Sequence, residues 1–193
     1  MNDATETDTL RRLQGLRLKG RSDAARIAGS WGDDESSVTR ALESLVAQGL
    51  VEEKKGTFAL TESGESRRVQ LLEAERSGLD DSAMQALYGD FCEVDPRFKS
   101  LVADLQLGKL ERDEAAAHLA PLHLRLQPLL DRASALLPRL SPYAQRFQEA
   151  LQALQQGDPR YLASPLVESY HGIWFEFHEE LIQSSGRSRA QEA

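Results

Sequence analysis

The stretch that decides the fold is residues 36–51, which contain Ser36-Ser37-Val38-Thr39-Arg40-Ala41-Leu42-Glu43-Ser44-Leu45 and then Gly49-Leu50-Val51. At about 100° per residue, a helix over the first ten residues gathers its apolar side chains on one stripe, namely Val38, Ala41, Leu42 and Leu45. The opposite face is polar and carries Ser36, Arg40, Glu43 and Ser44, flanked by Ser37 and Thr39. The stretch therefore predicts a helix with one buried face and one exposed polar face, which ends near Gly49.

The sequence on either side of this helix predicts more helices and a short hairpin within residues 1–76. Helices are expected over residues 8–20 and 22–28, with Ser22 as the N-cap of the second and a turn at residues 29–32. The turn at residues 55–56 predicts two short strands, residues 50–53 and 57–60. A further helix follows Thr61 and runs to about residue 76.

The quoted stretch resembles the recognition helix and wing entry of the MarR family. Leu60-Thr61 and Gly64 match that family's exit from the wing. The resemblance covers about residues 10–76 and implies a winged helix-turn-helix fold in a dimeric, DNA-binding transcriptional regulator.

The polar face of the predicted recognition helix suits a DNA major groove. Hydroxyls bond phosphates or bases, and the Arg40 guanidinium can fork onto a guanine. Basic side chains at the hairpin tip and around the second helix are expected to reach the flanking phosphates. The predicted DNA-binding residues are Arg21, Arg26, Ser36, Ser37, Thr39, Arg40, Lys54 and Lys55.

An alternative function is open for the same domain, because winged helices also serve as modules that bind a partner enzyme and never touch DNA. The hairpin is short and lacks the longer, arginine-tipped wing of the family, which argues against minor-groove contact. Four glutamates fall near the presumed DNA surface and repel phosphate: Glu35, Glu43, Glu52 and Glu53. The net charge of the chain is −8, so DNA affinity must come from a local patch.

Residues 77–193 predict a second, all-α domain after a polar boundary at residues 77–81. Helices are expected over residues 82–93, 97–106, 111–137, 142–156 and 165–184, with a break at Asp95-Pro96 and a bend at Pro121 or Pro128. The predicted fold class is mainly α: a winged helix-turn-helix domain with a small β-hairpin over residues 1–76, then a helical bundle.

The last predicted helix carries an apolar arc of about 200°, twice what packing on one core needs. The arc contains Leu166, Val167, Tyr170, His171, Ile173, Trp174, Phe175, Phe177, His178, Leu181 and Ile182, while Glu176 and Glu180 are among the polar residues that fill the rest. The surplus indicates a second apolar partner, most simply the same helix of another subunit. The pattern therefore predicts a homodimer.

A mixture of apolar and polar side chains on this helix is typical of an effector pocket in a helical domain. We expect Tyr170, His171, Trp174 and His178 to contact a small-molecule effector, although the same residues also suit an ordinary core. Residues 169–179 also resemble a segment of bacterial proteins labelled as MarR-like regulators. The effector is expected to change how two copies fit a pseudo-palindromic operator.

Composition and spacing argue against several other classes of protein. Glu114 and His118 lie four apart on a predicted helix, as in metal-binding effector domains of some GntR-family regulators, but the four histidines have no diagnostic spacing, so neither a metal nor a cofactor is predicted. No nucleophile elbow or phosphate-binding loop indicates an enzyme. A single cysteine, Cys92, and the lack of a membrane-spanning or signal sequence predict a cytoplasmic protein.

Overall fold

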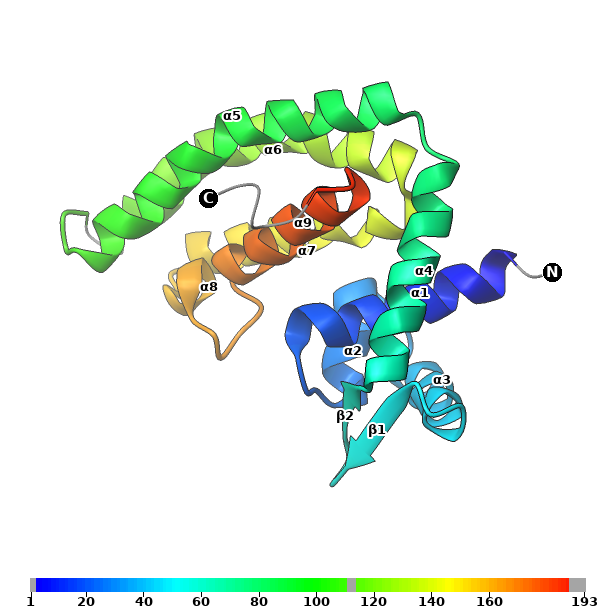
Figure 1. Cartoon of the computed structure of the whole chain (residues 1–193). Helices are drawn as coiled ribbons and strands as arrows, with labels where there is room; N and C mark the ends of the chain where they lie inside the picture. Colours follow the sequence, from blue (N-terminus) through cyan, green and yellow to red (C-terminus); the bar gives the residue numbers. More distant parts are fainter. Residues whose placement is uncertain (1–2, 111–113, 188–193) are drawn as a thin grey trace. The chain divides into compact units, whose positions relative to one another are not determined.

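The computed structural model describes residues 3–110 and 114–187. The chain is mainly helical and has a small antiparallel hairpin, which confirms the predicted mainly-α class (Figure 1). It divides into two compact units, residues 1–79 and 80–193, whereas the boundary was expected before residue 77. None of the described helices combines the length and the apolar character that crossing a membrane requires.

The N-terminal unit consists of helices and one two-stranded sheet. Its elements are α1 (Asp3–Lys19), α2 (Ala24–Trp31), α3 (Glu35–Ala47), β1 (Val51–Lys54), β2 (Thr57–Leu60) and α4 (Glu62–Ser77). The strands are antiparallel, with Val51 opposite Leu60 and Lys54 opposite Thr57. Backbone hydrogen bonds between Ser22 and Phe58, 2.8 and 3.0 Å long, attach the segment before α2 to the sheet.

Helix α1 is at the centre of this unit, because it contacts α2, α3, α4 and β2. The core contains the buried side chains Leu10, Leu13, Leu16, Ile27, Trp31, Val38, Leu42 and Leu45. Three expectations were wrong. Helix α1 begins five residues earlier than predicted, and α2 is capped by Asp23, which accepts a hydrogen bond from Arg26 N at 2.8 Å. Helix α2 also includes Trp31, predicted as a turn residue, because its buried ring belongs to the core.

A tight backbone contact fixes the start of α4 against the end of α3. Thr61 caps α4 by accepting a hydrogen bond from Gly64 N at 3.0 Å, and its hydroxyl donates to Gly49 O at 2.7 Å. A Cβ added to Gly64 would lie 1.9 Å from Leu50 O, so only glycine fits there. This explains physically why a glycine follows the hairpin at this spacing.

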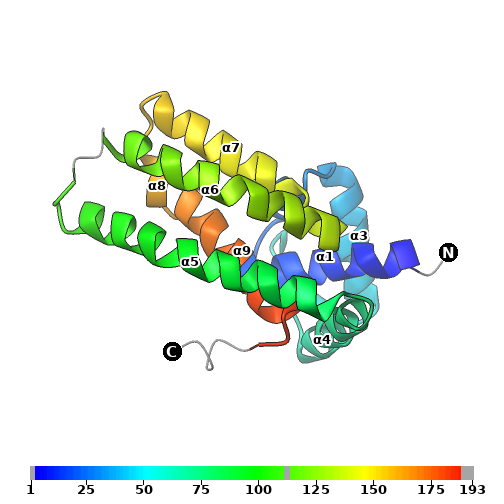
Figure 2. The same ribbon diagram turned by 90° about the horizontal axis from the view of Figure 1, so that it is seen from above.

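The C-terminal unit is a bundle of helices (Figures 1 and 2). Its elements are α5 (Asp81–Gln106), α6 (Ala115–Leu136), the 3-10 helix η2 (Pro138–Leu140), α7 (Pro142–Gln155), α8 (Arg160–Ala163) and α9 (Tyr170–Ser184). Helices α5 and α6 lie side by side in both views, and α9 packs against α5, α7 and α8. Aromatic rings form the centre of this core, namely Phe91, Phe98, Phe147, Tyr170, Trp174 and Phe177.

Two predicted helix boundaries in this unit were wrong. Helix α5 continues through Pro96 instead of breaking there, because buried residues on both sides, Phe91 and Phe98, hold it on the core at the cost of one backbone hydrogen bond. Helix α9 begins at residue 170, where Ser169 caps it, and not at residue 165. The predicted start of α6 at residue 111 lies outside the described residues.

Candidate functional site

The polar face of α3 is exposed, as its sequence predicted. Asp34 caps the helix by accepting a hydrogen bond from Ser37 N at 2.8 Å. The side chains opposite the buried stripe are exposed, namely Ser36, Ser37, Arg40, Glu43 and Ser44. Arg40 Nη2 donates to Ser37 Oγ at 3.0 Å, so the guanidinium lies along the exposed face. Thr39 is half-buried, and its hydroxyl donates to Glu35 O at 2.9 Å.

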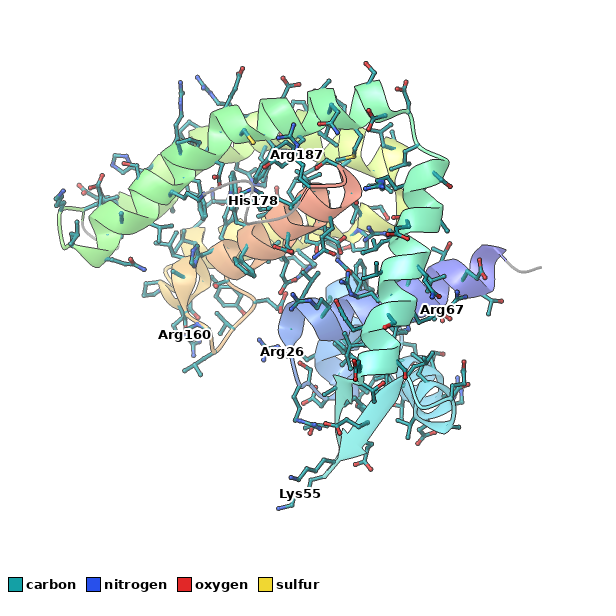
Figure 3. All side chains as sticks on the ribbon, in the orientation of Figure 1. Arg26, Lys55, Arg67, Arg160, His178 and Arg187 are labelled. Atoms are coloured by element: carbon teal, nitrogen blue, oxygen red, sulfur yellow. The ribbon has the colours of Figure 1, made fainter. Side chains whose placement is uncertain are left out.

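The basic residues predicted to meet DNA have two different environments. The guanidinium of Arg21 pairs with Glu52 and donates to Thr57 O at 3.4 Å, so its charge is already compensated. Arg26, Lys54 and Lys55 are exposed, and their side chains form no ion pair or hydrogen bond with the residues that the structure describes. Figure 3 shows Lys55 at the hairpin tip, pointing away from the strands. Its φ of 54° places it in the left-handed region at the turn.

A hollow of about 440 Å³ lies between α3, the start of α2 and the hairpin. Four carboxylates line it, those of Asp23, Glu35, Glu43 and Glu53, around the apolar side chains Ala24, Val46 and Phe58. Three of these acidic residues were expected near this surface from the sequence, and Asp23 was not. Carboxylates repel phosphate, so the hollow itself is unsuited to the DNA backbone.

Three of the four residues predicted to contact an effector are buried in the core of the C-terminal unit. Tyr170, Trp174 and His178 are at most 6% exposed, whereas His171 is exposed. Trp174 Nε1 donates to Asp95 Oδ1 at 2.9 Å. Packing in the core is enough to explain why these three side chains occur on the helix. Contact with an effector stays a prediction.

The buried rings also form polar contacts with neighbouring helices. Tyr170 Oη and His123 Nδ1 are 3.2 Å apart, and Nδ1 of His178 lies 3.8 Å from an Asp95 oxygen. Burial lowers the pKa of His123 and so favours its neutral form, and it raises the pKa of Tyr170.

The wide apolar arc of α9 is filled within the chain itself. Ile173, Phe177, Leu181 and Ile182 are at most 1% exposed, because α5, α7 and α8 surround the helix. Of the arc, Phe175 at 48%, Leu166 at 87% and His171 are exposed, and Leu166 precedes the helix. The arc therefore no longer indicates a second subunit, and homodimerisation stays a prediction without that support.

A buried ionic network along α9 escaped the sequence analysis. Arg139 Nη1 donates to Glu180 Oε2 at 2.6 Å, and both side chains are fully buried. Arg146 Nη2 donates to Glu176 Oε2 and Glu168 Oε2, each at 2.6 Å. Glu176 and Glu180 were placed on the polar face of the helical wheel, and nothing local signals their burial. The only sequence signal is a pair of arginines 41 and 30 residues away.

Tyr143 lies inside this network. The Arg146 guanidinium carbon is 4.9 Å from the centre of its ring. Burial, together with the nearby Glu180 and Glu176 carboxylates, raises the pKa of the phenol well above its usual value of 10.0. Burial on its own lowers the pKa of Arg146, but the interactions with Glu176, Tyr143 and Glu168 together outweigh burial and raise that pKa. Arg146 therefore stays charged in the interior, where the Glu176 and Glu168 carboxylates hold it.

Metal ligands do not gather in the described residues, because no three His, Cys, Asp or Glu side chains there lie close enough to share an ion. The pair considered from the sequence is exposed: Glu114 directly precedes α6, and His118 lies on its first turn. Cys92 is exposed on α5.

No family model, no curated protein and no solved structure matches this chain. The resemblance to the MarR family therefore remains a prediction, and function has to be argued from the residues.

Proposed function

We propose that the N-terminal unit is a winged helix-turn-helix domain that binds double-stranded DNA, and that the protein regulates transcription. Helix α3 enters the major groove and the β1–β2 hairpin lies against the sugar-phosphate backbone. The order of three helices, a hairpin and a fourth helix supports this assignment. The observation that carries it is the exposed face of α3, where Arg40 lies in solvent beside a row of hydroxyls.

The number of unpaired basic side chains on this surface limits how steeply its affinity for DNA can fall as salt rises. Four basic side chains of this surface have no acidic partner among the described residues: Arg26, Arg40, Lys54 and Lys55. If all four displaced counterions, the plot of log affinity against log salt would have a slope no steeper than about −3.6 per copy. A base-reading Arg40 makes the slope shallower still.

Binding to DNA from the protein's own upstream region and to a scrambled fragment, titrated across salt, tests the proposal. The full chain is expected to prefer the upstream fragment and to lose affinity as salt rises. Arg40→Ala should cost about 1–3 kcal/mol on the specific site and little on scrambled DNA, because a fork onto a guanine is base-specific. The matched control is Arg76→Ala, which removes an exposed arginine at the far end of α4 and should change neither affinity.

Two copies on a pseudo-palindromic operator belong to the same proposal. Their recognition helices would enter successive major grooves about one helical turn apart. Sedimentation of the protein with operator DNA is expected to give two copies per site. A single copy at saturation would restrict the proposal to a monomeric DNA-binding protein.

The acidic hollow favours a second candidate function, a protein-binding module. Four carboxylates around an apolar floor suit a lysine- or arginine-bearing segment of a partner protein better than a phosphate backbone. A lysine-rich synthetic peptide is the probe, and Glu35→Gln with Glu43→Gln should weaken its binding. Peptide binding together with a lack of preference for any DNA would replace the DNA proposal with this one.

A further inference from the structure

A second hollow, in the C-terminal unit, has the opposite charge. It has a volume of about 570 Å³ and lies between α5 and α6, the two helices that run side by side in Figure 2. Helix α5 contributes Arg97, Ser100, Leu101 and Asp104, and α6 contributes His118, Pro121, Leu122 and Arg125. In each helix these four positions are i, i+3, i+4 and i+7, so each set forms one stripe, and the two stripes face each other.

The two arginines and the histidine of this hollow have no polar partner in the described part of the chain. Arg97, Arg125 and His118 form no hydrogen bond or ion pair with any residue that the structure describes. The unit's other arginines that the structure describes make such contacts, as in the pairs Arg132–Asp90, Arg139–Glu180, Arg146–Glu176 and Arg160–Asp158. Residues 80–193 contain 11 basic and 17 acidic residues, so carboxylates are in excess. Arg97 and Arg125 therefore differ from the unit's paired arginines, because both line the same hollow and neither pairs with a carboxylate of the described residues.

The one carboxylate that the described residues place in the hollow is already compensated. Asp104 Oδ1 lies 3.6 Å from Lys109 Nζ, and Lys109 lines the same hollow. Because Asp104 and Lys109 compensate each other, the groups left to bind a ligand are the two guanidinium groups, one from each helix, and the His118 imidazole. Among the described residues, the nearest other acidic residues in the sequence, Asp95 on α5 and Glu114 just before α6, do not line the hollow.

The lining between the two arginines is apolar. Leu101 is buried, Leu110 and Leu122 are half-buried, and Pro121 completes the surface. Guanidinium groups bind carboxylate and phosphate through paired hydrogen bonds, and leucines favour a hydrocarbon body. The volume falls within the range of small-molecule sites.

We propose that the hollow between α5 and α6 binds a small organic anion with two acid groups joined by a short apolar body. One acid group pairs with Arg97 on α5 and the other with Arg125 on α6, so the ligand bridges the two helices. The site shares no residue with the four side chains of α9 that the sequence singled out. It does not depend on DNA binding by the N-terminal unit.

Calorimetric titration of the full chain with succinate, glutarate and adipate tests the site, because these dicarboxylates differ in the spacing between their two charges. The corresponding diamides have the same carbon skeleton without charge and serve as ligand controls. At least one dicarboxylate is expected to bind, more weakly at 200 mM than at 20 mM salt, and the diamides are expected not to bind. If none of the three dicarboxylates binds, or if a diamide binds as well as its diacid, the proposal is wrong.

Arginine variants inside and outside the hollow separate a specific site from a general effect of net charge. Arg97→Gln and Arg125→Gln should each weaken binding about tenfold or more, as expected for a lost charge-assisted hydrogen bond. Arg160→Gln is the matched control, because Arg160 is an exposed arginine of the same unit that pairs with Asp158 at 2.7 Å, outside the hollow. Equal losses in all three variants would overturn the assignment.

Asp104→Asn should strengthen binding severalfold, since it removes the one acidic side chain found among the described lining residues and leaves Lys109 available. Damage to the fold weakens binding and cannot strengthen it, so a gain in this variant cannot be explained by misfolding. Unchanged or weaker binding by Asp104→Asn would contradict the charge argument. The assay contains no DNA, so its outcome is independent of the proposed transcriptional role.

Discussion

Helices α3 and α9 have similar amphipathic sequences, but their polar faces have different environments. In α3 the polar face is exposed, and Arg40 and Glu43 lie in solvent. In α9 two of the polar residues, Glu176 and Glu180, are buried against arginines from the segments that precede and form α7. A helical wheel therefore identifies which residues share a face, but not whether that face meets water. The environment depends on what distant parts of the chain supply opposite to it.

The largest expected effect comes from removing one buried charge. Glu180→Ala leaves the Arg139 guanidinium in the interior without the carboxylate that it contacts at 2.6 Å, which should lower the free energy of unfolding by about 3–5 kcal/mol. Glu43→Ala on α3 is the matched control, and it should change stability by no more than about 0.5 kcal/mol because Glu43 is exposed. Urea unfolding of both variants gives the comparison. Similar losses in the two variants would remove the distinction between the helices.

A double substitution sharpens the same comparison. The free energy needed to remove the Arg139 and Glu180 charges from water offsets much of the attraction between them. Replacing both residues with apolar ones, Arg139→Met with Glu180→Leu, should therefore recover most of the stability that Glu180→Ala loses. A double variant as unstable as the single one would mean that the arginine contributes packing that methionine cannot replace.

Alkaline pH should also act on the region around α9. Because the pKa of Tyr143 is raised in the folded protein, the unfolded chain loses the phenolic proton first as pH rises above about 10. The unfolded state then binds fewer protons, and the free energy of unfolding falls by about 1.4 kcal/mol per pH unit for this group. Tyr143→Phe should reduce the slope above pH 10 by that amount. Below pH 8 its pH dependence should parallel that of the unsubstituted protein, and an unchanged slope above pH 10 would contradict the argument.

Local sequence predicted the elements whose signals are local. The turn at residues 55–56 gave the hairpin to within one residue, and the spacing of Val38, Leu42 and Leu45 gave the buried stripe of α3. Signals that depend on tertiary packing were missed. Pro96 predicted a break, but flanking core residues keep α5 continuous.

The same limit applies to the candidate sites. The exposed face of α3 and its hydroxyls followed from periodicity alone. The α5–α6 hollow was not foreseen, because Arg97 and Arg125 are 28 positions apart in the sequence and neither belongs to a motif. The burial of the α9 arc within the chain was not foreseen either. A helix surrounded by several neighbours needs an apolar arc as wide as that of a helix that also pairs with another subunit, so the sequence pattern is the same in both cases.

The smallest expected effect concerns the acidic residues beside α3 and rests on the proposed DNA binding. Glu43→Gln removes a carboxylate from the hollow between α3 and the hairpin and keeps the side-chain size. Less repulsion of phosphate should strengthen binding to specific and scrambled DNA alike, by a few-fold, or about 0.5–1 kcal/mol. Glu73→Gln, on the exposed side of α4, is the control for the change in net charge and should have a smaller effect. Competition titrations at low salt resolve differences of this size. If Glu43→Gln leaves DNA affinity unchanged but weakens the lysine-rich peptide, the acidic hollow is a protein-binding surface, and the exposed face of α3 has to be assigned to the same partner.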